Sequence, residues 1–170
     1  WIADTAVGIC RKWQEIVPDF RMSINLSYVQ LRDPSFKDAV KECVERYGVS
    51  PQSIVLELTE HTVISDWNFI NRQFASLRDY GLKIAMDDFG TGCSSLAMFK
   101  NLSCDIVKID RAFVKQILSS NFDRRIIEYT VELCHSVGMK VCIEGVETEE
   151  EYELLTKICK VDSIQGYLFG

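Results

Sequence analysis

The stretch IAMDDFGTG, residues 84–92, reads as a buried β-strand that breaks off in two aspartates and two glycines. Because side chains alternate between the two faces of a strand, Ile84 and Met86 share one face and Asp87 lies on the other. Asp88 follows directly. Two adjacent carboxylates at the end of an apolar run repel each other and are costly to desolvate. A bound cation would relieve both penalties.

Other strand-like runs divide in the same way, with one bulky apolar face and one face that ends in a polar group. In SIVLELT (53–59), Leu56 and Leu58 share the apolar face and Glu57 lies opposite. The remaining runs are RMSINLS (21–27) with Asn25, LKIAMD (82–87) with Asp87, DIVKID (105–110) with Lys108, KVCIEGV (140–146) with Glu144 and, more weakly, VDSIQG (161–166) with Gln165.

Helical patterns separate these runs. FKDAVKECVERYG (36–48) repeats apolar residues at helical spacing and stops at Gly48, a residue type that favours helix ends. Thr148 and Glu151 form a capping-box signature at another helix start. That helix is predicted over residues 148–160, and two others are predicted over residues 66–81 and 121–138. Such alternation predicts parallel strands joined by right-handed crossovers.

Two architectures fit this alternation: an open doubly wound sheet and a closed barrel. An open sheet covered by helices on both sides would bury the polar strand ends under apolar layers. A barrel would gather them at the C-terminal mouth of a common interior, where such barrels carry out chemistry. The pattern therefore favours an α/β fold of the (β/α)8 TIM-barrel type, here incomplete, with about six β/α units.

The polar strand ends would then meet at one rim. Carboxylates so close together cannot all stay ionised without cations, and hard oxygen ligands select Mg²⁺ or Mn²⁺. Asp87 and Asp88 would reach two neighbouring ions, about 3.5–4 Å apart in the usual arrangement for phosphoester cleavage. Lys108 would orient or help deprotonate the attacking water, or balance phosphate charge. Gly90 and Gly92 would let the loop backbone approach a ligand closely.

Each of these residues has a simpler interpretation when taken alone. DDFGTG also fits a helix-capping turn, and Asn25 would cap its own turn. Glu57 would serve as an ion-pair partner for Lys108. The coincidence of so many such groups at strand ends favours the metal site.

Composition excludes several classes of protein. The 170 residues, 47% hydrophobic and 26% charged, are typical of one domain, and the net charge of -6 argues against a DNA- or RNA-coating surface. No apolar run approaches the ~20 residues of a membrane span, so no membrane contact is expected of this segment. The seven cysteines lack CxxC spacing and are expected to be reduced core thiols in a cytoplasmic protein, although the parent protein could be membrane-anchored.

Six motifs, in this order, resemble the EAL domain family of bacterial cyclic-di-GMP phosphodiesterases. They are INLSYVQL (24–31), LELTE (56–60), DDFGTGCSSL (87–96), DIVKID (105–110), IEGVET (143–148) and QGYLFG (165–170). The resemblance implies a (β/α)8-type barrel that hydrolyses one phosphodiester bond of cyclic di-GMP to linear pGpG with two Mg²⁺ or Mn²⁺ ions. It also implies a homodimer and, in the parent protein, an upstream sensor or GGDEF-type domain.

The resemblance also assigns roles to individual residues. It implies Asn25, Glu57 and Asp87 as ligands of one metal; Asp87, Asp88 and Glu144 as ligands of the other; Lys108 as the contact to the nucleophilic water; Gln165 in the metal–water shell; and Glu147 as the support of the loop that contains Gly90, Thr91 and Gly92. In this family that loop links substrate binding to dimerisation.

The sequence departs from the family pattern in two places. Cys93 stands where the family usually has Tyr, and the Glu-Ala-Leu signature does not occur. We therefore expect residues 1–170 to be an EAL-type domain cut at its N-terminus, and at its C-terminus also, without the first two strands and their metal-binding glutamate and substrate-contacting arginine. The fragment alone is expected to be weak or inactive. Two alternatives remain: a cyclic-di-GMP receptor without catalysis, and another metal-using barrel such as a sugar-acid lyase or isomerase.

Overall fold

The computed structural model describes residues 2–59, 66–90 and 103–169. Its centre is one sheet of six strands in the spatial order β1-β2-β3-β4-β5-β6, with every neighbouring pair parallel. The strands are β1 (Met22–Asn25), β2 (Ile54–Thr59), β3 (Lys83–Phe89), β4 (Ile106–Ile109), β5 (Lys140–Ile143) and β6 (Ser163–Ile164). The order in space equals the order in sequence, whereas a doubly wound sheet reverses its order at a switch point.

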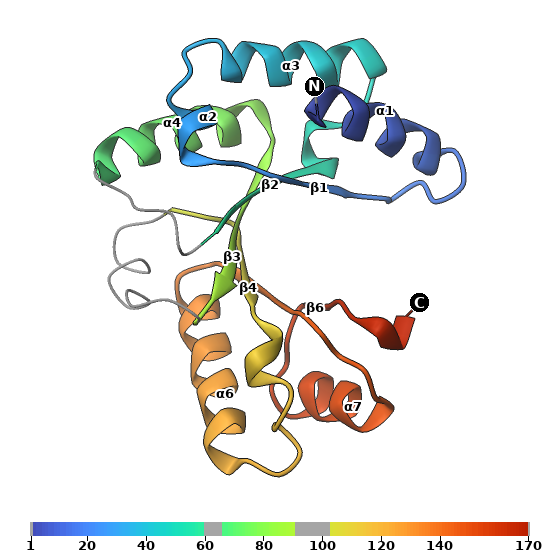
Figure 1. The fold of residues 1–170 in the computed structure, drawn as a ribbon, viewed down its shortest axis with the longest axis vertical. Helices are drawn as coiled ribbons and strands as arrows, with labels where there is room; N and C mark the ends of the chain where they lie inside the picture. The colour runs from blue at the N-terminus through green and yellow to red at the C-terminus, as the bar shows by residue number, and fades with distance from the viewer. Residues whose placement is uncertain (1, 60–65, 91–102, 170) are drawn as a thin grey trace.

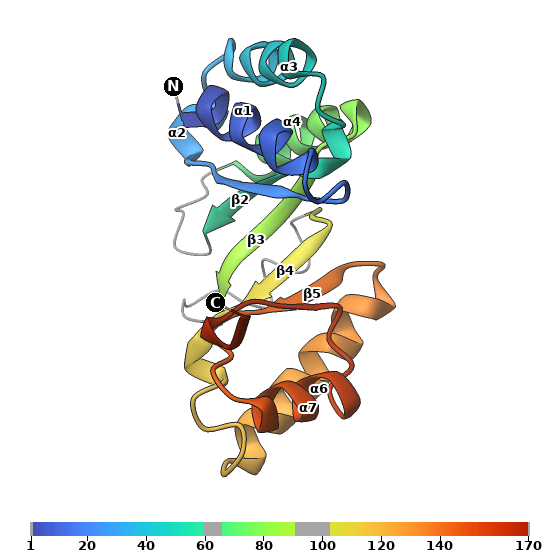
Figure 2. The same cartoon turned by 90° about the vertical axis from the view of Figure 1, so that its right-hand side faces the viewer.

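In the described part of the chain, helices follow β1, β2, β4 and β5, and the helices lie on the outer side of the curved sheet (Figures 1 and 2). The α-helices are α1 (Ile2–Gln14), α2 (Tyr28–Leu31), α3 (Phe36–Tyr47), α4 (Trp67–Tyr80), α6 (Asn121–Ser136) and α7 (Glu149–Lys157), and the 3₁₀ turns are η1 (Pro51–Ser53), η2 (Arg111–Phe113) and η3 (Tyr167–Phe169). The arrangement is a half-barrel, which confirms the predicted incomplete (β/α)8-type fold.

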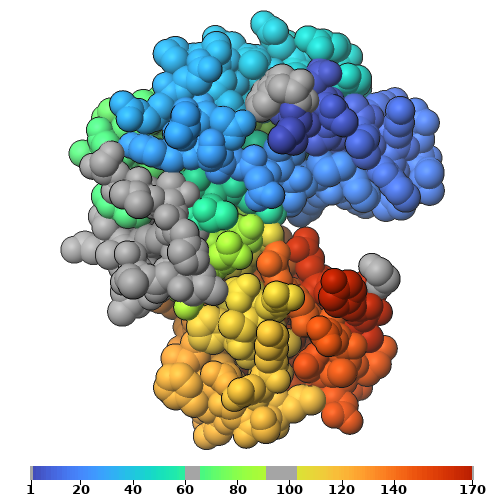
Figure 3. All heavy atoms as spheres, viewed as in Figure 1, coloured from blue at the N-terminus to red at the C-terminus, as the bar shows by residue number. Residues whose placement is uncertain are grey.

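The two faces of the sheet divide as the alternation of side chains predicts. Ile84 and Met86 of β3 are fully buried under the helices, together with Leu56 and Leu58 of β2. The opposite face lines a cavity of about 200 Å³ inside the half-barrel. Its lining residues are Arg21, Ser23, Val55, Glu57, Ala85, Ile106, Lys108, Cys142, Ser163 and Gln165. The molecule is visibly hollowed on one side, between the segment of α1 and β1 and the C-terminal segment (Figure 3).

Helix ends follow local sequence signals. Gly48 ends α3 in the left-handed conformation with φ 62°, as predicted from its position. Thr148 and Glu151 form the predicted capping box: Thr148 Oγ1 accepts from the Glu151 N–H at 3.2 Å, and the Glu151 carboxylate accepts from the Thr148 N–H at 3.0 Å. The short helix α2 was not predicted, although Ser27 and Gln30 form a second capping box at its start.

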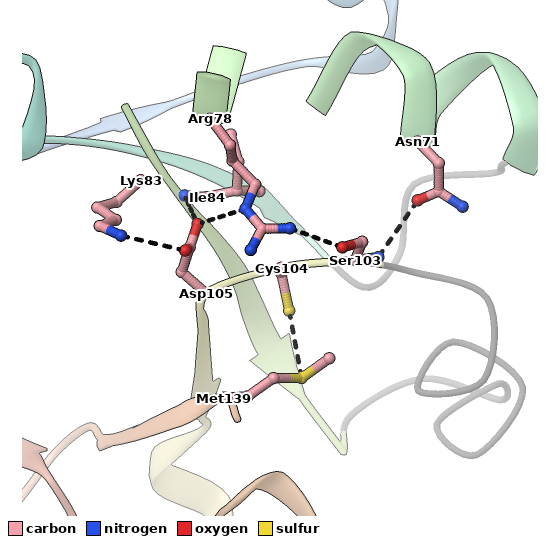
Figure 4. A network of polar contacts seen from close by, with 8 residues as sticks. All are labelled: Asn71, Arg78, Lys83, Ile84, Ser103, Cys104, Asp105 and Met139. Atoms are coloured by element: carbon pink, nitrogen blue, oxygen red, sulfur yellow. Dashed lines mark hydrogen bonds and ion pairs between the residues drawn. The ribbon is translucent and has the colours of Figure 1, made fainter. Parts of the chain in front are cut away.

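A polar network fixes the strands at the rim opposite their C-terminal ends (Figure 4). Asp105, just before β4, accepts a hydrogen bond from the Ile84 N–H at 3.0 Å. Its carboxylate also pairs with Arg78 of α4 and Lys83 of β3, each at 3.3 Å. These contacts join α4, β3 and β4, and nearby the Cys104 thiol lies 3.8 Å from Met139 Sδ.

The cysteines behave as core residues. All six in the described ranges are buried and free, which confirms the prediction for them; Cys93 lies outside those ranges. Burial raises the pKa of Cys104 to about 12 and that of Cys159 to about 11, so neither thiol is reactive at neutral pH. None of the helices in the described part of the chain combines the length and apolar character needed to cross a membrane.

Candidate metal centre

Three carboxylates meet at the C-terminal ends of β3 and β5. Asp87, Asp88 and Glu144 each offer an oxygen, and these oxygens lie within 4.8 Å of one another. Adjacent residues of a regular strand point to opposite faces. Here the pairing with β4 shifts register between Met86 and Phe89, and Asp88 adopts a left-handed backbone with φ 56°. This irregularity places both aspartates beside one site.

Lys108 of β4 lies among the carboxylates of three other strands or strand ends. Its ammonium Nζ is 3.0 Å from Glu57 Oε2, 2.9 Å from Asp87 Oδ1 and 2.6 Å from Glu144 Oε1. The Lys108 and Glu57 side chains are only 8% and 7% exposed. The structure therefore contains both the predicted Glu57–Lys108 ion pair and the predicted acidic cluster, and Lys108 belongs to both.

The charge state of Lys108 follows from its partners. Burial disfavours the ammonium, but the contacts with Glu144, Asp87 and Glu57 outweigh it and raise the pKa of Lys108 above its ordinary value. The side chain is therefore a cation at neutral pH. The rim thus sets this one ammonium among four acidic side chains, those of Glu57, Asp87, Asp88 and Glu144.

The atoms of this rim fit divalent cations. Oδ1 of Asp87 is buried, and the Lys108 ammonium contacts it at 2.9 Å. The ligand atoms of Asp87, Asp88 and Glu144 are all carboxylate oxygens, which is the donor type that Mg²⁺ and Mn²⁺ prefer.

A cleft of about 640 Å³ opens beside the cluster. It is lined by Ile2, Ile24, Asn25, Leu26, Ser27, Tyr28, Gln30, Thr59, Asp87 and Asp88. Asn25 is the register partner of Glu57 across β1 and β2, so the structure brings Asn25, Glu57 and the aspartates to one end of the sheet. Thr59 was not among the predicted site residues, yet it follows Glu57 on the same face of β2 and its parity could have indicated it.

The remaining predicted residues lie in different places. Gln165 lines the inner cavity with Glu57 and Lys108, whereas Glu147 is exposed and its N–H donates to the Glu151 carboxylate at 2.9 Å. Gly90 forms a turn with φ +96°. Thr91 and Gly92 lie outside the described residues, as does most of the loop that Glu147 was predicted to support.

The fold and the rim define a class: parallel (β/α)-barrel proteins whose polar site lies at the C-terminal ends of the strands. The sequence profile of the EAL domain matches residues 1–170. The chain belongs to the EAL domain family.

Relatives of known name agree with this assignment. The chain is 34% identical over 171 residues to the bifunctional diguanylate cyclase/cyclic di-GMP phosphodiesterase MucR of Pseudomonas aeruginosa, covering 100% of this chain and 25% of MucR. The solved PaMucR phosphodiesterase in complex with c-di-GMP superposes with a TM-score of 0.88 over 100% of this chain and 69% of that one, at 34% identity. The curated relatives are thus much longer than the chain, which spans about a quarter of MucR.

Two further solved structures share the fold. The EAL domain of Mycobacterium smegmatis DcpA gives a TM-score of 0.93 at 32% identity, covering 100% of this chain and 77% of that one. The Klebsiella pneumoniae BlrP1 manganese/cy-diGMP complex gives 0.84 at 27% identity, covering 98% of this chain and 43% of that one. These likenesses support the half-barrel as part of an EAL barrel.

Proposed function

We propose that this chain forms part of a metal-dependent phosphodiesterase that hydrolyses cyclic di-GMP to linear pGpG. The observation that carries the proposal is the rim of Asp87, Asp88 and Glu144 around the Lys108 ammonium in a chain of the EAL family. Relatives named as cyclic di-GMP phosphodiesterases support the substrate.

The carboxylates would hold two Mg²⁺ or Mn²⁺ ions. Asn25, Glu57 and Asp87 are proposed for one ion, and Asp87, Asp88 and Glu144 for the other. Bound there, the ions would supply an activated water and Lewis-acid stabilisation of the charge that develops on the phosphate. The Asp88 backbone would be essential, because its left-handed conformation lets both aspartates serve the same site.

Lys108 would act as a donor and a fixed positive charge. Its Nζ lies 2.9 Å from Asp87 Oδ1 and 2.6 Å from Glu144 Oε1, so we assign it to orienting the attacking water by hydrogen bonding and to stabilising negative charge. Removing a proton from that water is not assigned to it. Gln165, which shares the inner cavity with Lys108, would contact the same water shell.

The neighbouring cleft would take the dinucleotide. Asp87 and Asp88 form part of its wall, so a phosphodiester bound in the cleft would lie against the proposed ions. The open side of the half-barrel and the length of MucR support a larger protein around this chain. We propose an upstream sensor or GGDEF-type domain in that protein and a homodimer as its assembly.

The experiment is to incubate the intact protein that carries this chain with cyclic di-GMP and Mn²⁺ and to separate the products by chromatography. The expected product is pGpG, and EDTA should stop its formation. Calorimetry run in parallel separates the alternatives. Binding of cyclic di-GMP without any product would establish a receptor and reject the enzyme, and neither binding nor product would reject both.

A further inference from the structure

The 3₁₀ turn η2 follows β4 directly and contacts the chain beyond both neighbouring strands. Two glycines mark these contacts, Gly90 after β3 and Gly145 after β5, and both have positive φ. Gly90 is two residues from Asp88, and Gly145 follows Glu144. Residues of η2 therefore lie against the two segments that carry the proposed metal ligands.

The contact with Gly90 is made by the Phe113 ring. A Cβ placed on Gly90 would lie 2.4 Å from Phe113 Cε2 and 2.7 Å from Cζ, which is closer than real atoms approach. The ring edge thus packs directly on the Gly90 backbone. Phe113 is half-buried and packs against the hydrophobic core. The core therefore restricts movement of the ring away from Gly90.

The contact with Gly145 is made by Arg111. A Cβ on Gly145 would lie 2.3 Å from Arg111 Cβ and 3.3 Å from its Cα. The backbone of the turn itself is fixed by Asp110, whose carboxylate accepts from the Ala112 N–H at 2.8 Å. On the strand side, Ile109 O accepts from the Glu144 N–H at 3.1 Å. Each end of η2 is therefore anchored.

The position of η2 matters because β3 and β5 do not pair with each other. Strand β4 lies between them, so the separation of Asp88 and Glu144 is set by whatever spans β4 at this rim. Mg²⁺ accepts ligand oxygens only near 2.0–2.1 Å, and functional groups must be held within about 0.5 Å of their working geometry. Contacts across β4 are thus a requirement of such a site.

We propose that Phe113 is a positioning residue for the metal centre: its ring, packed on Gly90, holds Asp87 and Asp88, at the end of β3, at the distance from Glu144 that a divalent cation needs. Arg111 on Gly145 does the same from the other side. This inference rests on the proposed function, because it assumes that Asp87, Asp88 and Glu144 bind the metal.

The test compares Phe113→Ala, Phe113→Leu and wild type in the intact protein. Mn²⁺ binding is measured by calorimetry and by the spin-resonance signal of free Mn²⁺, and hydrolysis is measured against Mn²⁺ concentration. Phe113→Ala should weaken Mn²⁺ binding about 10-fold or more, as expected for loss of a group that orients ligands. The turnover number at saturating Mn²⁺ should fall much less, and Phe113→Leu should restore most of the affinity. Phe122→Ala, at an exposed position on α6, is the control.

A second comparison isolates the contact itself. Gly90→Ala and Gly138→Ala both place alanine at positive φ, but a Cβ on Gly138 meets nothing within 4 Å. Only Gly90→Ala should weaken Mn²⁺ binding, and adding Phe113→Ala should partly restore it by removing the clashing ring. This arm remains informative if Phe113→Ala alone fails to fold.

The outcomes separate the inference from the proposed function. Wild-type Mn²⁺ affinity in Phe113→Ala, or equal effects of Gly90→Ala and Gly138→Ala, would overturn the positioning role and leave the phosphodiesterase intact. A wild-type protein that binds Mn²⁺ but yields no pGpG would reject the enzyme. The Mn²⁺ affinities of the Phe113 and Gly90 variants would still test the positioning role of the Phe113–Gly90 contact. A wild-type protein that binds no Mn²⁺ would overturn both.

Discussion

Lys108 Nζ lies 3.0 Å from Glu57 Oε2 although the two residues belong to strands that are not neighbours: β4 carries the lysine, β2 carries the glutamate, and β3 runs between them. Both side chains are buried. The ion pair therefore spans the inner surface of the half-barrel and ties three strands together at their C-terminal ends, with Asp87 of the middle strand also in contact with the ammonium.

Lys108→Met should therefore destabilise the metal-free protein by about 3 kcal/mol or more, because it leaves buried carboxylates without their cation. Urea denaturation in EDTA measures the loss. Added Mn²⁺ should recover part of the stability by neutralising the same carboxylates. Lys115→Met, at an exposed position, is the matched control. Equal stabilities of the two variants would contradict the role given to the Lys108 charge.

Asp87→Asn should abolish cyclic-di-GMP hydrolysis, because Asp87 is the carboxylate proposed to serve both ions. Mn²⁺ binding should weaken in the same variant while the fold is retained, since asparagine has nearly the same shape. The measurements are pGpG formation and calorimetric Mn²⁺ titration, with exposed Asp19→Asn as the control. Normal turnover in Asp87→Asn would reject the proposed ligand set.

Much of this site was predictable because strand periodicity is a geometric property of the sequence. The alternation in SIVLELT and DIVKID placed Glu57 and Lys108 on the inner face, and the structure puts both in the inner cavity. Their proximity at one rim followed from the strand direction, because parallel strands have their C-terminal ends at the same edge of the sheet. No longer-range information was needed for these two residues.

Asp88 and Phe113 show where such reasoning ends. Strict alternation would turn Asp88 away from Asp87, and only the left-handed backbone and the register shift place both beside Glu144. A single-residue backbone change leaves no periodic signal in the sequence. The position of Phe113 depends on a 3₁₀ turn, for which the only local indication was Asp110 as a capping residue.

Asp162 should contribute stability that depends on pH. Burial alone would raise its pKa, but the hydrogen bonds from His135 at 2.8 Å and the Val141 N–H at 2.8 Å outweigh it, so the pKa lies below the ordinary 3.8. A lowered folded-state pKa means that the contribution is present above about pH 3.8 and is lost as pH falls through the folded-state value.

Asp162→Asn should accordingly be less stable than wild type at pH 7, and the difference should shrink as the pH is lowered below the ordinary carboxyl range. Denaturation midpoints across this pH series provide the measurement. Asp19→Asn, which changes an exposed carboxylate, should show no such convergence. A difference that stays constant with pH would indicate a purely steric effect of the asparagine.

Gly166→Ala should destabilise the C-terminal segment, because the new Cβ would lie 2.1 Å from the backbone oxygen of Val146 and 2.4 Å from its nitrogen. Backbone atoms cannot yield as a flexible side chain can, so we expect about 2 kcal/mol from overpacking. Gly48→Ala is a useful comparison, since a Cβ there meets nothing within 4 Å and only its positive φ opposes alanine. Urea denaturation should rank Gly166→Ala as the more damaging change, and the reverse order would contradict the close contact.

Asp105→Ala should separate stability from function. It removes the carboxylate that pairs with Arg78 and Lys83 and accepts from the Ile84 N–H (Figure 4), so we expect a loss of about 2 kcal/mol from a buried donor left without its partner. Asp105 precedes β4, at the rim opposite the candidate metal centre, and residues at that rim of a barrel serve stability. The variant should therefore bind Mn²⁺ with wild-type affinity at temperatures where it is folded, as measured by calorimetry beside a thermal denaturation curve. Weaker Mn²⁺ binding by folded Asp105→Ala would show that the two rims are coupled through β3 and β4.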